Sequence, residues 1–351
     1  MGMLAVLVLL GTGVVLALGV SGHTPPITDA DGRVLPNSIA SLERIELGGM
    51  EQWILIRGAD RSKPILLWLH GGPGGAQMPF AHRVDRELER HFVVVHWDQR
   101  GAGKSNHRGF DERTMHLDRY IEDALELTAY LQTRLEVDTL VLLGHSWGTR
   151  IGMQLVDRHP ELFEAYIGVG QVVHHERATV VAFAWLEETI DAERAPQDWQ
   201  ALMGIEIPAR QHSEYRELNR LTTKYGGSLD LSSAELGRIV LAAPEYSFRD
   251  YPRLLRGMNR GGRPLHAGGI MQNYDLIESI PVVEVPVYFF AGARDFNTPL
   301  PLIREYYEIL DAPQKDLVVF EEAAHLPFLS QNRRFVEEVV RVVGGMPGSL
   351  P

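Results

Sequence analysis

The neighbours of Ser146 in this 351-residue chain indicate that its hydroxyl takes part in catalysis. It stands in Gly144-His-Ser-Trp-Gly148, after the apolar run 141–143 and before a helical pattern of apolar residues. A serine between two glycines, with a strand before it and a helix after it, is typical of a nucleophile elbow, whose tight turn exposes the hydroxyl. The sequence therefore predicts that Ser146 is a catalytic nucleophile.

A serine hydroxyl is a weak nucleophile at neutral pH and needs a general base. Asp295 follows the apolar run 285–292, and His325 follows the apolar run 316–320. Because the ends of parallel strands meet at one edge of a sheet, we expect both side chains to lie beside Ser146. His325 would accept the serine proton, and Asp295 would orient the imidazole and stabilise its charged form. Each residue alone also fits an ordinary loop histidine or helix N-cap, but their combination with Ser146 favours catalysis.

A glycine-rich loop, His70-Gly-Gly-Pro-Gly-Gly75, follows the continuous apolar run 64–69. Such runs are typical of strands that are buried on both faces of a parallel sheet. In hydrolases with a G-x-S-x-G elbow, a glycine-rich loop after such a strand supplies one backbone N–H of the oxyanion hole. The residue after the nucleophile supplies the other. The predicted donors are the backbone groups of Gly72 and Trp147. A plain turn would need only one or two of these glycines.

The composition disfavours several classes of function. The chain has 34 Lys and Arg against 46 Asp and Glu, and its net charge of −12 disfavours nucleic acid as a partner. It contains no cysteine, which excludes disulfides, thiol catalysis and cysteine-ligated metals. The segment Gly101-Ala-Gly-Lys-Ser105 lacks the upstream glycine of a phosphate-binding loop, because position 98 is Asp. We therefore expect no cofactor and no metal, and the substrate to be a small molecule or a short peptide.

Residues 3–20 carry no charged side chain and are rich in Leu and Val. The length of this run is at the short end for a membrane-spanning helix and exceeds the usual apolar core of a signal peptide. We interpret residues 1–22 as an export signal or a single membrane anchor, followed by a linker at 23–40. The protein is thus predicted to be membrane-anchored or exported, and the sequence does not indicate its oligomeric state.

The remaining chain alternates between strand and helix patterns, with one interruption. Two strand signals meet at Gly48-Gly49, which predicts a hairpin. Segments 41–171 and 281–351 predict an α/β fold with a mostly parallel sheet and helices on both faces. Segment 172–280 has helical patterns only, and we interpret it as a cap that covers the active site and holds the substrate-binding residues, none of which is assigned.

Several polar residues outside this set invite a catalytic interpretation. Asp98 and Arg100 follow the apolar run 92–97, and we interpret them as a charged pair that fixes a loop beside the active site. The cap histidines have no spacing to carboxylates that suits a metal, and we interpret them as surface or cap residues: His174, His175 and His212.

Taken together, these motifs make the chain resemble the proline iminopeptidase branch of the α/β-hydrolase superfamily. The chain order of serine, aspartate and histidine agrees with it. The resemblance implies an α/β-hydrolase fold, hydrolysis through an acyl-enzyme, and release of an N-terminal residue, often proline, from short peptides. It covers roughly residues 45–170 and 280–345, and the matching pieces are His70–Gly74, Trp97–Gly101 with Gly103 and Ser105, Gly144–Gly148, Gly292–Asp295 and Ala324-His325.

The chain departs from that family in the elbow and the cap. His145 stands where these aminopeptidases usually carry glycine, and the family binds the amine of its substrate through cap glutamates, which cannot be assigned here. A carboxylesterase or lactonase on the same scaffold is an alternative, because the same catalytic groups cleave esters. A non-catalytic ligand-binding protein with a hydrolase fold is a second alternative. The cap glutamates are Glu187, Glu188, Glu206, Glu214, Glu217 and Glu245.

Overall fold

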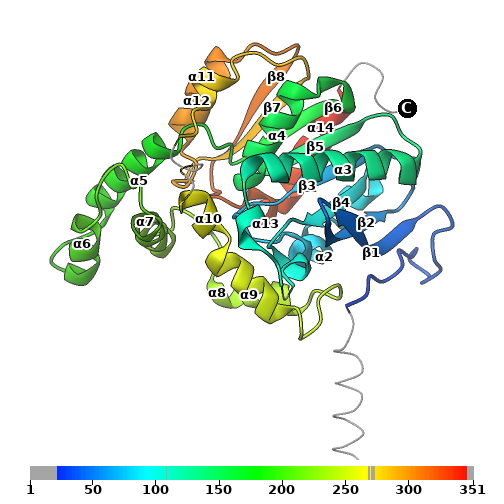
Figure 1. Ribbon diagram of the computed structural model, residues 1–351, viewed down its shortest axis with the longest axis horizontal. Helices are drawn as coiled ribbons and strands as arrows, with labels where there is room; N and C mark the ends of the chain where they lie inside the picture. The colour runs from blue at the N-terminus through cyan, green and yellow to red at the C-terminus, as the bar shows by residue number, and fades with distance from the viewer. Residues whose placement is uncertain (1–21, 108, 268, 270–272, 346–351) are drawn as a thin grey trace, which may run out of the picture.

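A computed structural model describes residues 22–345, apart from residues 108, 268 and 270–272. Its centre is one eight-stranded sheet with the strand order β1-β2-β4-β3-β5-β6-β7-β8 (Figure 1). The first two strands form the predicted hairpin and β2 pairs antiparallel with β4, whereas all other neighbours are parallel. The strands are β1 Ile39–Leu47, β2 Met50–Gly58, β3 Ile65–Leu69, β4 Val93–Asp98, β5 Leu140–His145, β6 Phe163–Val169, β7 Val287–Gly292 and β8 Lys315–Phe320.

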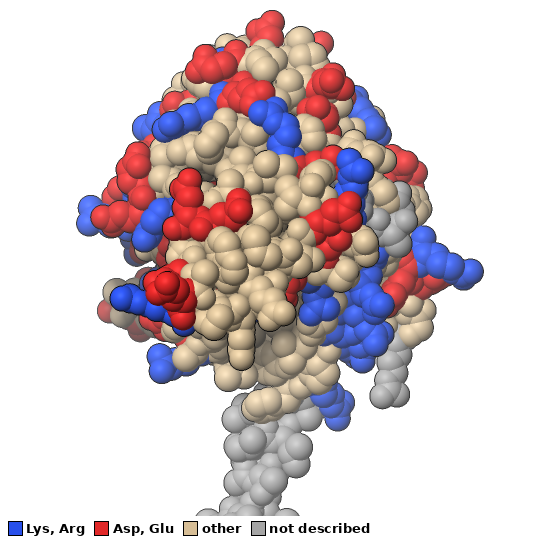
Figure 2. Space-filling view, turned by 90° about the vertical axis from the view of Figure 1, so that its left-hand side faces the viewer, with Lys and Arg blue, Asp and Glu red and all other residues tan. Residues whose placement is uncertain are grey.

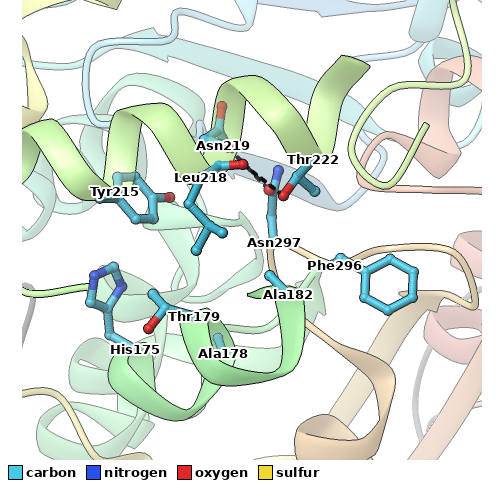
Figure 3. A pocket seen from close by; sticks show the side chains of 10 residues that line it. All are labelled: His175, Ala178, Thr179, Ala182, Tyr215, Leu218, Asn219, Thr222, Phe296 and Asn297. Atoms are coloured by element: carbon cyan, nitrogen blue, oxygen red, sulfur yellow. Dashed lines mark hydrogen bonds between the residues drawn. The ribbon is translucent and has the colours of Figure 1, made fainter. Parts of the chain in front are cut away.

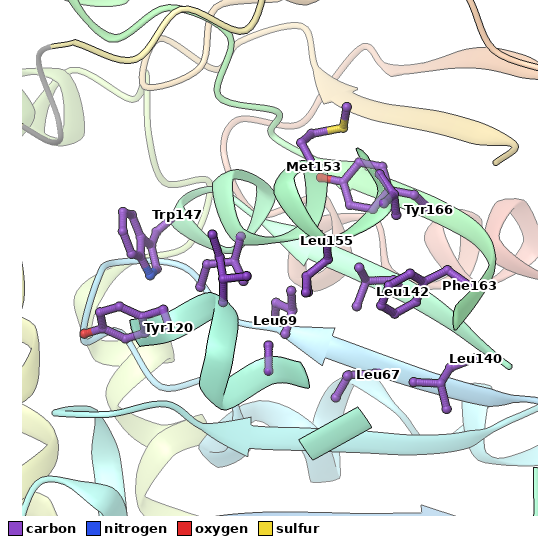
Figure 4. Close-up of a cluster of buried hydrophobic side chains, with 14 of the residues drawn as sticks. Leu67, Leu69, Tyr120, Leu140, Leu142, Trp147, Met153, Leu155, Phe163 and Tyr166 are labelled. Carbon is purple, nitrogen blue, oxygen red and sulfur yellow. The ribbon is translucent and has the colours of Figure 1, made fainter. Parts of the chain in front are cut away.

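Helices cover both faces of the sheet, as predicted. Every residue of β3 and β5 is buried, which is why these central strands consist of continuous apolar runs. One core lies under α3, α4 and α12, and the other under α2, α13 and α14. Figure 4 shows part of the first core, in which side chains of α3, α4 and the strands meet. These helices are α2 Ala81–Val84, α3 Leu117–Leu135, α4 Trp147–Arg158, α12 Leu300–Ile309, α13 Pro327–Ser330 and α14 Asn332–Gly344.

The segment between β6 and β7 contains only helices among its described residues, as expected for a cap. In Figure 1, α5, α6 and α7 project to one side of the sheet, and α8 and α9 lie below it. Helices α5, α6 and α7 share a small apolar core of their own. The cap helices are α5 His175–Thr189, α6 Pro196–Met203, α7 His212–Lys224, α8 Ser233–Leu241, α9 Tyr251–Arg260, α10 Gly262–Ala267 and α11 Leu276–Ser279.

The two ends of this insertion are joined to each other. His174 and Asp275 form a short antiparallel bridge. The N–H of Leu276 donates to the carbonyl of Val173 at 2.9 Å. The two connections between the sheet and the insertion therefore contact each other where the chain leaves and returns.

Among residues 22–345 as described, no helix has both the length and the apolar character to cross a membrane. The apolar run 3–20, on which the predicted anchor or export signal depends, lies outside the described residues.

Candidate active site

Ser146 occupies the tight turn between β5 and α4. Its backbone has φ 52° and ψ −116°, a conformation that residues other than glycine rarely adopt. A Cβ atom added to Gly148 would lie 2.0 Å from the carbonyl oxygen of Leu69, so only glycine fits there. The N–H of Ser146 donates to the carbonyl of Val169 at 3.0 Å, which ties the turn to the end of β6. The strand, turn and helix of the predicted nucleophile elbow are thus present.

His325 and Asp295 are joined by a hydrogen bond of 2.7 Å between Nδ1 and Oδ2. Both side chains are buried. The other carboxylate oxygen accepts the N–H groups of Asn297 at 2.8 Å and Thr298 at 3.1 Å, and the Thr298 hydroxyl donates to Oδ2 at 2.6 Å. A carboxylate can only accept, so His325 carries its proton on Nδ1 and leaves the lone pair of Nε2 available to a serine hydroxyl.

The end of β6 contacts both Ser146 and His325. Val169 accepts the N–H of Ser146, and the next residue, Gly170, lies against the His325 ring. A Cβ atom added to Gly170 would lie 3.2 Å from Cε1 of that ring. The structure thus gathers the three residues that the sequence singled out at one edge of the sheet.

The predicted oxyanion donors flank Ser146. A Cβ atom added to Gly71 would lie 3.1 Å from the Ser146 Cβ, which places the glycine loop directly against Ser146. Gly72, one peptide further on, has φ +119°. Trp147 is the first residue of α4, and the first N–H groups of a helix have no acceptor within it. The roles of Gly72 and Trp147 as oxyanion donors remain a prediction.

Gln99 links the glycine loop at His70 to Trp147 of the elbow by hydrogen bonds. Its side chain donates to the carbonyl of His70 at 3.0 Å and accepts the indole N–H of Trp147 at 3.2 Å. Its backbone N–H donates to Nε2 of His70 at 3.1 Å. Burial lowers the pKa of His70 to about 4, so the ring stays neutral and keeps this acceptor. Gln99 belongs to the Trp97–Gly101 motif, whose role the sequence alone did not give.

His145 contacts His325, which the sequence did not predict. Its ring is buried, and its Nε2–H donates to the carbonyl of His325 at 3.0 Å. Burial lowers the pKa of His145 well below its usual range, so the ring is neutral. A Cβ atom added to Gly71 would lie 2.8 Å from its Nδ1. The His145 ring therefore lies between His325 and the glycine loop, and its only sequence signal was the departure from glycine at that position.

The interpretation of Asp98 and Arg100 as one charged pair is wrong. Arg100 forms a two-pronged ion pair with Asp123 of α3, with both N–O distances at 2.9 Å. Asp98 accepts the N–H of Lys104 at 2.7 Å and the hydroxyl of Tyr246 from the cap. Burial raises the pKa of Asp98 to about 6. The two side chains fix the loop through separate partners, one in α3 and the other in the cap and the Lys104 backbone.

A small pocket, partly open to solvent, lies between α5, α7 and the loop after Asp295 (Figure 3). The side chain of Asn219 donates to Oδ1 of Asn297 at 3.0 Å, and Asn297 also binds Asp295 through its N–H. The cavity therefore adjoins the loop that holds Asp295. Its described lining residues include no carboxylate: His175, Ala178, Thr179, Ala182, Tyr215, Leu218, Asn219, Thr222, Phe296 and Asn297.

The cap glutamates lie elsewhere. Glu214 accepts the N–H of Gln211 and caps α7, Glu217 pairs with Arg220 at 2.8 Å, and Glu245 is buried. None of the six glutamates named above is among the described residues that line this cavity. His175, interpreted as a surface or cap histidine, is in the cap but is buried, and its ring lies 5.0 Å from that of Tyr215. Within the described part of the chain, no group of three or more His, Asp or Glu side chains is placed to hold a metal.

The model of a known family, described as the alpha/beta hydrolase fold, matches residues 64–331. The chain belongs to the alpha/beta hydrolase family. A probable aminopeptidase of Bacillus subtilis is 30% identical over 310 residues, which cover 87% of this chain and 96% of that protein. A proline iminopeptidase of Clostridium botulinum is 26% identical over 286 residues, which cover 78% of this chain and 87% of that protein.

Solved structures agree with the fold of this hydrolase. A proline iminopeptidase-related protein from Thermus thermophilus superposes with a TM-score of 0.63 at 20% identity, covering 87% of this chain and 98% of that one. A proline iminopeptidase from Mycobacterium smegmatis gives a TM-score of 0.63 at 20% identity, covering 86% and 97%. The predicted resemblance to the proline iminopeptidase-like branch is confirmed, and the chain is a hydrolase.

Proposed function

We propose that this hydrolase works through an acyl-enzyme on Ser146 and releases the N-terminal residue of short peptides. The hydrogen bond between His325 and Asp295, next to the strained turn of Ser146, is the observation that carries this proposal. The names of the aminopeptidase relatives support the choice of a peptide substrate.

The geometry supports a sequence of balanced steps. His325 takes the hydroxyl proton of Ser146 through Nε2 while the serine oxygen bonds to the substrate carbonyl carbon. The backbone N–H groups of Gly72 and Trp147 stabilise the negative oxygen of the tetrahedral intermediate. The carbonyl–nitrogen bond then breaks, and the leaving amine takes the proton from His325. Water hydrolyses the acyl-enzyme by the reverse proton path and restores the serine.

A carboxylesterase or lactonase is the second candidate, and the cap cavity favours it. A free ammonium group is bound best by carboxylates, and no carboxylate is among the described residues that line this cavity. The same nucleophile, base and oxyanion donors cleave esters, so the cap contacts decide between the two candidates.

Three substrates separate these proposals. The full-length protein is given a prolyl arylamide with a free amine, the same compound N-acetylated, and a short-chain aryl ester, with Ser146→Ala as the control. Turnover of the free amine alone, lost in Ser146→Ala, supports an aminopeptidase. Turnover of the ester with none of either amide would refute the peptidase and support the esterase. Hydrolysis that persists undiminished in Ser146→Ala would refute the acyl-enzyme itself.

A further inference from the structure

The outer side of α8 and α9 presents large apolar side chains to solvent. Among the described residues, four of the nine large apolar side chains with high exposure lie within residues 241–258. They are between 58% and 65% exposed: Leu241, Phe248, Leu255 and Met258. Single exposed apolar residues are normal on protein surfaces, whereas a group of them rimmed by charges marks an interaction site.

The exposed charges on this side are mostly positive, with Glu235 of α8 and Glu112, which lies 4.0 Å from Arg260, as acidic neighbours. Every exposed ionisable side chain of residues 236–265 is an arginine, although the whole chain carries a net charge of −12. The two acidic residues of the segment, Glu245 and Asp250, are buried. Figure 2 shows Lys and Arg side chains gathered at the lower right of one face, beside surface without charge. The exposed arginines are Arg238, Arg249, Arg256, Arg260 and Arg263.

Helix α9 separates the two kinds of side chain and is firmly held. Leu255 and Met258 are three residues apart, and Arg256 and Arg260 are four apart, so each pair lies along one line of the helix surface. The opposite side is packed against the body of the protein, since a Cβ atom added to Gly257 would lie 2.9 Å from the carbonyl oxygen of Gly101. The surface formed by the exposed residues of 238–263, here called the docking face, is therefore a preformed part of the fold.

The start of the described chain lies beside the docking face. The N–H of His23 donates to the carbonyl of Pro244 at 2.9 Å, between Leu241 and Phe248 in sequence. The uncharged run 3–20 therefore joins the folded protein next to the exposed apolar side chains. A basic patch beside an apolar segment adds electrostatic attraction to anionic lipid headgroups.

We propose that the docking face binds the surface of a membrane that contains anionic phospholipids. Leu241, Phe248, Leu255 and Met258 enter the headgroup region, and the arginines pair with lipid phosphates. The charges favour this partner over a second copy of the chain, because a symmetric contact would bring the arginines of both copies together. The proposal does not depend on whether the substrate is a peptide or an ester.

The absence of cysteine allows a direct test in the full-length protein. Met258→Cys is labelled with an environment-sensitive fluorophore, and Ile309→Cys is the control, since Ile309 is an exposed apolar residue of α12. Each protein is mixed with vesicles of phosphatidylcholine alone or with 30% phosphatidylglycerol. We expect the emission of the label at 258 to shift to shorter wavelength on the anionic vesicles and to be quenched by brominated lipid, with no change at 309.

Arginine variants test the charge. Arg256→Gln/Arg260→Gln should lower the partition coefficient for anionic vesicles about 30-fold, since each basic residue near such a surface contributes about 1 kcal/mol. Partition into phosphatidylcholine vesicles and turnover of a soluble substrate should not change. The matched control is Arg333→Gln/Arg341→Gln on α14, two arginines that are also exposed and that should leave both partition coefficients unaltered.

Three results would overturn the proposal. The protein could sediment with vesicles while the label at 258 still reports water, in which case residues 3–20 bind the membrane without the docking face. The label could shift without lipid as protein concentration rises, in which case a second copy covers the face. Equal partition into neutral and anionic vesicles would exclude the role of the arginines.

Discussion

Removal of the His145 side chain tests whether this residue positions the catalytic base. His145→Ala deletes a buried ring and leaves the carbonyl of His325 without its donor. Loss of the hydrogen bond costs about 1 kcal/mol, and the cavity left by a large buried side chain costs about 2 kcal/mol or more. We expect a destabilisation of about 3 kcal/mol, which for a chain of this size is on the order of 5 °C in Tm.

The same variant should lower kcat more than it changes KM. A base displaced by a fraction of an ångström loses its alignment with the serine, and such misplacement costs about 10- to 100-fold in rate. His145→Gln is the matched variant, because its amide nitrogen can replace Nε2 as the donor to His325. Glutamine should restore most of kcat even where Tm stays low.

The pH dependence of stability provides a second measurement on the same variant. Burial lowers the pKa of His145 well below 6.5, so the unfolded chain binds a proton that the folded chain does not. Its contribution to stability is present above pH 6.5 and is lost as the pH falls below it. The unfolding free energy of His145→Ala should therefore depend less on pH in this range. Unchanged kcat together with a lowered Tm would refute the positioning role, and no change in either would refute the packing argument.

Three further predictions concern substitutions of Asp295, Asp98 and Arg100. Asp295→Asn should lower kcat about 10³- to 10⁴-fold with little change in Tm, because an amide facing Nδ1 favours the wrong tautomer of the base; a loss below tenfold in steady-state kinetics would contradict this. Asp98→Asn should make the stability less dependent on pH. The pKa of Asp98 is about 6 in the folded state and 3.8 in the unfolded state, so the folded state binds the extra proton between these values. The unfolding free energy of the parent protein should therefore fall by about 3 kcal/mol as the pH rises from about 4 to 6. Urea unfolding at pH 4.5 and pH 7 measures it, and a variant with the slope of the parent would show that another group titrates. Arg100→Met should cost about 3 kcal/mol, because it leaves Asp123 buried with one cation fewer, whereas Arg33→Met at an exposed ion pair should be neutral; equal effects in chemical denaturation would disprove the distinction.

Most of the strands and helices of the sheet region could be predicted from the sequence. Helix α3, Leu117–Leu135, has a long and regular amphipathic pattern of the kind that a sequence shows directly. The strands that precede Ser146 and Asp295 were visible as apolar runs, since a strand buried on both faces has no polar side to interrupt it. The elbow was predictable because close packing demands glycine at fixed positions around Ser146.

Contacts between distant segments were beyond the sequence. Asp98 and Arg100 looked like partners because they are two residues apart, but their partners lie in the cap and in α3. The cap cavity is lined by α5, α7 and the loop after Asp295, so no local pattern announces it. His145 showed the same limit, since its contact with His325 joins residues 180 positions apart.

The bridge between His174 and Asp275 has a consequence for how this scaffold can change. An insertion whose two ends are already joined needs little chain entropy to close, whatever its length. The cap can therefore be exchanged as a cassette between these two residues, while the sheet below keeps its register. A chimera that carries the cap of an aminopeptidase relative at this junction should take over the substrate preference of that relative, while the turn at Ser146 stays unchanged.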